Sequence, residues 1–222
     1  MRAQHFWLEL MSFYTADELL VGDATRKDRR VMRANVGWGM RGKTPVVRDT
    51  ILTRGDSVSA FTLFSHKGFE SWRYTRANFN ARSWQVEAEI LRLPASNSHS
   101  SCMARALSQR AMDEMLFTRR ADGTRLINQF ECLLLDNASI HKDPEYLLKL
   151  KTRIQVKFLP PYCFEFSPLD NGAYGLVVRF LKAPENADLY GSQPIEVGLD
   201  AAFKSVDEDS ARWCFHNCRY YF

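Results

Sequence analysis

Hydrophobic and polar positions along the chain follow two spacings, and together they predict a mixed α/β domain. Helical spacing predicts helices over residues 4–14, 84–92, 102–117, 144–151, 167–182, 195–204 and 207–218. Short apolar or β-branched runs between turn residues predict strands over residues 18–24, 46–53, 57–65, 68–75, 130–141 (ending at Asp136) and 154–162. Residues 184–194, rich in Pro, Asn and Gly, are expected to form a linker. This succession indicates helices packed in layers on a sheet.

Three aspartates stand at the ends of these predicted elements. Asp23 closes one apolar run, Asp136 closes another, and Asp170 lies in the first turn of the helix that Ser167 is expected to cap. Carboxylates are the hard oxygen ligands that Mg²⁺ and Mn²⁺ prefer, and two such ions ~4 Å apart promote phosphoryl transfer. Each aspartate alone is more typical of a cap or a turn. The hypothesis of a shared metal site therefore rests on the three together.

The net charge of +4 is concentrated in one stretch of the sequence. Its basic residues are Arg26, Lys27, Arg29, Arg30, Arg33, Arg41, Lys43 and Arg48, opposed before Asp49 only by Asp28. Such a run can neutralise nucleic-acid phosphates, and it is as typical of a solvated hairpin face. Trp38, inside the run, is suited either to stacking on a base or to packing under a turn.

Composition indicates one ordinary globular domain, with 45% hydrophobic and 25% charged residues among 222. No stretch approaches the length of apolar sequence that a membrane span needs, and the N-terminus does not read as a signal peptide. Five scattered cysteines then favour reduced thiols in a nuclear or cytoplasmic protein. Cys214, His216 and Cys218 lie close together, but zinc takes about four ligands, so buried thiols on a terminal helix are the favoured interpretation.

Two blocks of the sequence resemble the DDE endonuclease domain of mariner-like transposases. Residues 136–141 (DNASIH) are similar to the strand-final Asp-Asn-Ala-x-x-His of that family. Residues 159–162 (LPPY) and 167–170 (SPLD) are similar to its Leu-Pro-Pro-Tyr-Ser-Pro block, and the third acid falls on Asp170. Similar features surround the first acid, namely Asp23, Arg29-Arg30, Gly37-Trp38 and Arg41-Gly42-Lys43. Residues 207–221 resemble the closing helix of the family.

The resemblance implies an RNase H-like fold, with a mixed sheet of about five strands (an antiparallel meander plus parallel strands) flanked by helices. It implies that Asp23, Asp136 and Asp170 are catalytic and bind two Mg²⁺ or Mn²⁺ ions, with Asn137 and His141 supporting them. It also implies DNA partners, both transposon ends and target, and no membrane or small-molecule cofactor. A homodimer is expected because dimers are usual in the family. The proposed DNA contacts are Arg26, Lys27, Arg29, Arg30, Arg33, Trp38, Arg41 and Lys43.

The chain also departs from the family pattern in identifiable places. Ala24 follows the first aspartate, where many relatives have Glu, and Cys163-Phe164 replaces Ser-Pro. Residues 76–129 match poorly, which is consistent with a lineage insertion or with a sequence disrupted by decay or by a misplaced exon boundary. We therefore expect a single catalytic domain over residues 1–222, with core blocks 18–75 and 130–182, C-terminal helices within 195–218, and no N-terminal helix-turn-helix modules.

Three functions are consistent with these features. The first is a metal-dependent DNA endonuclease and strand transferase for cut-and-paste transposition. The second is a decayed or domesticated transposase fragment that binds nucleic acid through its basic surface without catalysis. The third is an RNase H-like nuclease that acts on RNA–DNA hybrids, which the LPPY and SPLD blocks disfavour.

Overall fold

The computed structural model describes residues 2–32, 40–42, 57–75, 112–117, 119–120, 122–137, 142 and 144–222. Its centre is a five-stranded sheet with the order β3-β2-β1-β4-β5. The strands are β1 (Leu19–Asp28), β2 (Ser57–Ser65), β3 (Gly68–Thr75), β4 (Cys132–Leu135) and β5 (Gln155–Phe158). β1, β2 and β3 pair antiparallel, whereas β1, β4 and β5 pair parallel. The expected mixed sheet of about five strands is therefore confirmed.

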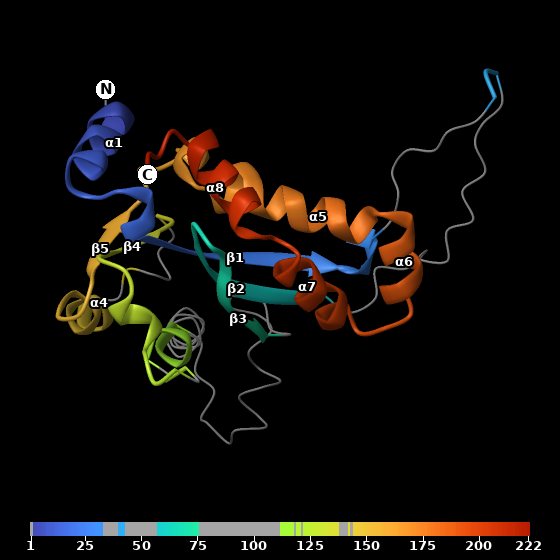
Figure 1. Cartoon of the computed structure of the whole chain (residues 1–222), viewed down its shortest axis with the longest axis horizontal. Coiled ribbons are helices and arrows are strands. Elements are labelled where there is room, and N and C mark those ends of the chain that lie inside the picture. The colour runs from blue at the N-terminus through green and yellow to red at the C-terminus, as the bar shows by residue number, and fades with distance from the viewer. Residues whose placement is uncertain are drawn as a thin grey trace, which may run out of the picture.

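Helices cover the sheet and extend beyond its end (Figure 1). The α-helices are α1 (Arg2–Phe13), α4 (Pro144–Lys151), α5 (Tyr174–Lys182), α6 (Pro184–Tyr190), α7 (Ile195–Lys204) and α8 (Glu208–Asn217). Short 3₁₀ segments are η1 (Ala16–Glu18), η2 (Arg29–Met32), η3 (Leu126–Asn128) and η5 (Phe164–Phe166), and η6 (Leu169–Ala173) is a π-helix. Residues 112–117 are also helical. No helix in the part of the chain that the structure describes is both long and apolar enough to cross a bilayer.

Alternation along the strands divides the core into two clusters, one on each face of the sheet. Leu19 and Val21 of β1 point to the face that α5, α7 and α8 cover. Leu20 points to the opposite face, which residues 112–117 and α4 cover. β4 alternates in the same way, with Leu134 in the first cluster and Leu133 in the second. The same alternation assigns the residues that follow these apolar runs to the α5 face.

Three predicted elements differ from the structure. β1 does not end at Asp23 but continues to Asp28, so Asp23 lies inside the strand. Residues 184–194 were expected to be a linker, yet they contain α6, which begins at Pro184 because proline suits the first turn of a helix. The helix predicted over residues 167–182 begins as the π-helix η6 and becomes α-helical at Tyr174. The strand predicted over 46–53 and the helix over 84–92 lie outside the described residues.

Candidate active site

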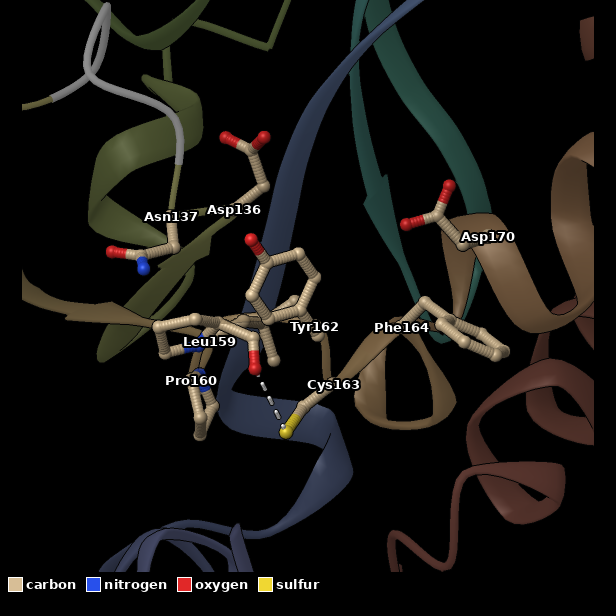
Figure 2. Close-up of a pocket in the computed structure, with 9 residues that line it drawn as sticks. Asp136, Asn137, Leu159, Pro160, Tyr162, Cys163, Phe164 and Asp170 are labelled. Carbon is tan, nitrogen blue, oxygen red and sulfur yellow. Dashed lines mark hydrogen bonds between the residues drawn. The ribbon is translucent and has the colours of Figure 1, made fainter. Parts of the chain in front are cut away.

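A pocket of about 370 Å³ opens where β4 and β5 end (Figure 2). Two of the three predicted acids line it, Asp136 directly after β4 and Asp170 in η6. The rest of the lining is Asn137, Leu159, Pro160, Pro161, Tyr162, Cys163 and Phe164. The structure thus brings together the two sequence blocks that carried the second and third aspartates.

Asp23 does not line this pocket, but it lies beside it in the sheet. The last pair of the parallel β1–β4 register is Gly22 with Leu135, and Asp23 and Asp136 are the residues that follow on each side. Strand alternation points both side chains to the α5 face, where Asp170 also lies. One carboxylate oxygen of Asp23 accepts a hydrogen bond from the backbone N–H of Ala24, at 2.7 Å.

The three carboxyl groups lie within electrostatic range of one another. Burial raises the pKa of Asp23 well above its ordinary value, and the charges of Asp170 and Asp136 raise it further. The pKa of Asp170 is also raised, first by burial and then by Asp136, while Ser167 and Lys27 oppose the shift. Without metal, the carboxyl groups of Asp23 and Asp170 are therefore harder to ionise than free aspartate. A divalent cation bound among the acids would lower their pKa values, because its charge stabilises the carboxylates.

The donor set fits a hard divalent cation in charge and in chemistry, because all three groups offer carboxylate oxygens. Among the described residues, however, no group of three His, Cys, Asp or Glu side chains converges closely enough to enclose an ion. Asp23, Asp136 and Asp170 thus share one region without meeting at one point. This arrangement suits ions that complete their coordination with water and phosphate.

Buried hydroxyl groups hold the backbone at Asp23. The hydroxyls of Tyr174 and Thr62 lie 2.9 Å apart and share their two protons between each other and the carbonyl oxygen of Asp23, which lies 3.3 Å from Tyr174 and 3.4 Å from Thr62. Lys27 lies on the same face of β1 as Asp23, with its Nζ 5.7 Å from the centre of the Tyr174 ring. Burial lowers the pKa of Lys27, and the charge of Asp170 opposes that shift. Lys27 therefore faces the acidic cluster, a position that its place in a basic run did not reveal.

Packing against α8 and the C-terminal segment holds the π-helix that carries Asp170. The backbone N–H of Asp170 donates to Ser167 Oγ at 3.2 Å, although the N-cap position of η6 is Pro168, one residue after the predicted cap. Gly172 approaches α8 so closely that an added Cβ would lie 2.6 Å from Cys214 Sγ. Asn217 donates to the carbonyl of Asn171 at 3.0 Å. The residue type at position 172 is thus fixed by the contact between two helices.

The predicted supporting and DNA-contacting residues have varied surroundings. Asn137 lines the pocket and accepts a hydrogen bond from Lys142. Arg29 donates to the carbonyl of Gln193 at 2.7 Å, Arg30 pairs with Asp28 at 2.7 Å, and Arg26 donates to Ser57 at 2.6 Å. Arg41 is exposed in a turn. His141, Arg33, Trp38 and Lys43 lie outside the described residues.

Sequence reasoning did not single out Tyr162 as a site residue. Its side chain is 98% exposed, it lines the pocket, and its φ of 62° lies in the left-handed region. The available signal was the preceding Pro160-Pro161 pair, because proline favours a turn whose next residue has positive φ. Cys214 and Cys218 are buried free thiols, whereas His216 of the same segment is exposed.

The sequence matches no protein-family model and no curated protein. Its structure, however, is similar to solved structures of Mos1, a mariner transposase. It superposes on the Mos1 mariner paired end complex with Mn at a TM-score of 0.60 and 18% identity, covering 98% of this chain and 58% of that one. It superposes on a pre-cleavage Mos1 transpososome at a TM-score of 0.60 and 15% identity, covering 98% of this chain and 57% of that one. It superposes on the Mos1 catalytic domain with Raltegravir and Mg at a TM-score of 0.51 and 18% identity, covering 98% of this chain and 88% of that one.

These likenesses establish the fold. The chain has the architecture of the Mos1 transposase catalytic domain, which confirms the RNase H-like fold expected from the sequence. The chain spans somewhat more than half the length of the transpososome chains that it matches.

Proposed function

We propose that this chain is the catalytic core of a mariner-like DDE transposase, a metal-dependent DNA endonuclease and strand transferase. One observation carries the proposal. Within the Mos1 catalytic fold, Asp136 and Asp170 line one pocket, and the β1–β4 register sets Asp23 beside Asp136 on the same face. The positions of the three aspartates in the fold thus support the roles proposed for them from the sequence motifs.

In this proposal Asp23, Asp136 and Asp170 hold two Mg²⁺ or Mn²⁺ ions. Mos1 catalytic domain structures have been determined with Mg and with Mn, which supports divalent metal use by that protein. When bound, such ions activate the attacking oxygen and stabilise the leaving oxygen of a phosphodiester. The three carboxylates would hold the ions, Asn137 and His141 would support them, and Lys27 would contact the phosphates of the DNA. Asp23 and Asp170, whose pKa values are raised in the metal-free protein, would ionise fully with a divalent cation beside them.

Two displacements on phosphorus make up the proposed reaction. Water attacks the phosphodiester at a transposon end and releases a 3′-hydroxyl. That hydroxyl then attacks a phosphodiester of target DNA, so that one P–O bond forms as another breaks. The proposed partners are transposon ends and target DNA, with a homodimer that brings two ends together. The Mos1 relatives are paired end and strand transfer complexes, which is the assembly that suggests this arrangement.

Nicking of supercoiled plasmid tests the proposal. The wild-type chain should nick with Mg²⁺ or Mn²⁺ and stop in EDTA. Asp136→Asn should lower the rate by more than the roughly 10- to 100-fold that loss of an outer-shell metal partner costs. Asp209→Asn, an exposed aspartate of α8 outside the pocket, serves as the matched control and should nick normally.

Two results would contradict the enzyme. If Asp136→Asn nicks as fast as wild type, the activity belongs to another site or to a contaminant. If no variant nicks or binds metal while DNA binding falls steeply with salt, the chain is instead a domesticated nucleic-acid-binding protein. Cleavage of RNA–DNA hybrids in preference to duplex DNA would favour an RNase H-like nuclease.

A further inference from the structure

A tight turn after β5 holds Tyr162 at the pocket. The backbone N–H of Cys163 donates to the carbonyl of Pro160 at 3.3 Å, which closes a four-residue turn. Pro161 occupies the second position and Tyr162 the third, where φ is 62°, a pattern that fits a type II turn. Glycine or asparagine normally fills that third position because a side chain is disfavoured at positive φ. A tyrosine there is an outlier that points to a role for its side chain.

The turn is anchored next to the catalytic acids rather than free of them. Leu159 donates its backbone N–H to the carbonyl of Leu135 at 2.9 Å, so the turn starts beside the residue that precedes Asp136. Because β4 and β5 are parallel, the turn and Asp136 both follow the carboxyl ends of their strands, at the same end of the sheet. Tyr162, Asp136 and Asp170 line the same pocket, as Figure 2 shows.

Two aromatic rings of this loop are left in solvent. Tyr162 is 98% exposed and Phe164, two residues on, is 67% exposed, and both line the pocket. Exposed aromatic rings that border a pocket mark a surface that binds a ligand. The pocket volume of about 370 Å³ falls within the range of sites that bind small ligands. The ligand must therefore offer a flat apolar face to the rings, close to a group that carboxylate-bound metal ions accept.

An unpaired nucleotide has both properties. Its base stacks on aromatic rings whatever the sequence, and its phosphate is the ligand of the metal ions. We propose that Tyr162 and Phe164 form an aromatic platform that stacks a nucleobase separated from its partner strand, next to the phosphate to be cut. The inference rests on the proposed function, because it takes the ligand to be DNA. It adds that the site accepts a locally unpaired strand, and it makes Tyr162 a positioning residue.

Binding of a fluorescent DNA probe tests the platform separately from catalysis. The probe is a short duplex with a single-stranded 3′ extension that carries 2-aminopurine, a base whose emission falls when it stacks. It is titrated with the full chain in Ca²⁺ and again in EDTA. Tyr162→Ala should weaken binding of the extended probe about 5- to 150-fold, the loss expected for one stacked base. Binding of the blunt duplex should change little.

Matched variants separate stacking from folding. Tyr162→Phe keeps the ring and should bind within about twofold of wild type with the same loss of emission, whereas Tyr162→Leu should behave like Tyr162→Ala. Trp213→Ala, which removes a 54% exposed aromatic ring outside the pocket lining, should leave both readouts unchanged. Phe164→Ala should produce a smaller loss than Tyr162→Ala.

The outcomes distinguish the platform from the wider proposal. If wild type binds the probe but Tyr162→Ala keeps its affinity and its emission, the platform is overturned while the DNA-binding function stands. If Tyr162→Ala weakens binding of blunt and extended probes equally, the ring contacts duplex DNA, and the unpaired-strand inference is again overturned. If wild type binds no DNA, the proposed function itself fails, and the exposed rings would then be a surface for a protein partner.

Discussion

Asp23 and Asp170 lie on the same face of the sheet, but different parts of the fold hold them. Asp23 sits inside β1, between β2 on one side and the end of β4 on the other, with two buried hydroxyls on its carbonyl. Asp170 sits in a π-helix that relies on side-chain contacts with α8 and the C-terminal segment. Backbone pairing fixes the first acid, whereas packing between helices fixes the third.

The difference predicts where each acid is vulnerable. A backbone ladder tolerates many side chains, so β1 can carry polar and basic residues after Asp23 and still remain a strand. A close helix contact depends on the size of particular residues, because the interior is densely packed. We therefore expect substitutions distant in sequence from Asp170 to disturb it more than comparable substitutions disturb Asp23.

The largest expected effect comes from the two glycines that flank the start of α5. Gly172→Ala places a Cβ 2.6 Å from Cys214 Sγ and should destabilise the fold by about 1–3 kcal/mol, the usual cost of overpacking. Gly175→Ala meets nothing within 4 Å and should stabilise it by about 0.5–1 kcal/mol. Urea unfolding measures both changes. Equal shifts in the same direction would show that contact with α8 does not constrain position 172.

A smaller effect is expected at two buried tyrosine hydroxyls, one near Asp170 and the other beside the backbone of Asp23. Tyr220 donates to the carbonyl of Phe166 at 2.8 Å, near the helix of Asp170, and Tyr220→Phe should cost about 1–2 kcal/mol. Tyr174→Phe should cost about 0.5–1.5 kcal/mol, because Thr62 still donates to the carbonyl of Asp23. Thermal unfolding of both variants checks the order. A larger loss of stability in Tyr174→Phe would show that the backbone at Asp23 depends more on a single hydroxyl than the helix of Asp170 does.

The last expected change is a slope in stability with pH. The pKa of Asp23 is raised in the folded protein, so the folded state holds its proton more tightly than the unfolded chain does. Its contribution to stability is therefore full below the ordinary value of 3.8 and is lost as pH rises through the folded pKa. Asp23→Asn should unfold with a flatter pH dependence than metal-free wild type, and Mg²⁺ should flatten wild type too. A steeper pH dependence in Asp23→Asn than in wild type would contradict the expected direction of the Asp23 contribution to stability.

The sequence predicts the position of an acid best where local pattern and tertiary structure end together. The apolar run before Asp136 stops where β4 stops, and Asp136 follows as expected. β1 is different, because β4 covers only its first part, up to Gly22. Beyond that point β1 pairs with β2 alone and its side chains are only partly buried, so polar residues continue the strand. The apolar pattern therefore marked the end of β4 and not the end of β1.

Other features depend on contacts that no local pattern contains. The π-helix at Asp170 forms where Gly172 meets α8, a contact between residues far apart in the sequence. The start of α8 is different, because Asp207 has a residue type that is typical of a helix cap, and it accepts a hydrogen bond from the backbone N–H of Ser210 at 2.9 Å. The exposure of Tyr162 follows from the geometry of a turn after β5, which its residue type alone would not indicate.

The parallel register between β1 and β4 has a consequence for how the gene can change. Asp23 and Asp136 become neighbours through that register, and not through the length of chain that joins β3 to β4. The free-energy cost of closing a loop grows slowly, by about 0.6 kcal/mol for each doubling of the loop length. Residues 112–117, 126, 127 and 130 contribute to the second core cluster, so insertions that spare them should be tolerated. The chain that joins β3 to β4 can therefore change in length while Asp23 and Asp136 remain neighbours in the sheet.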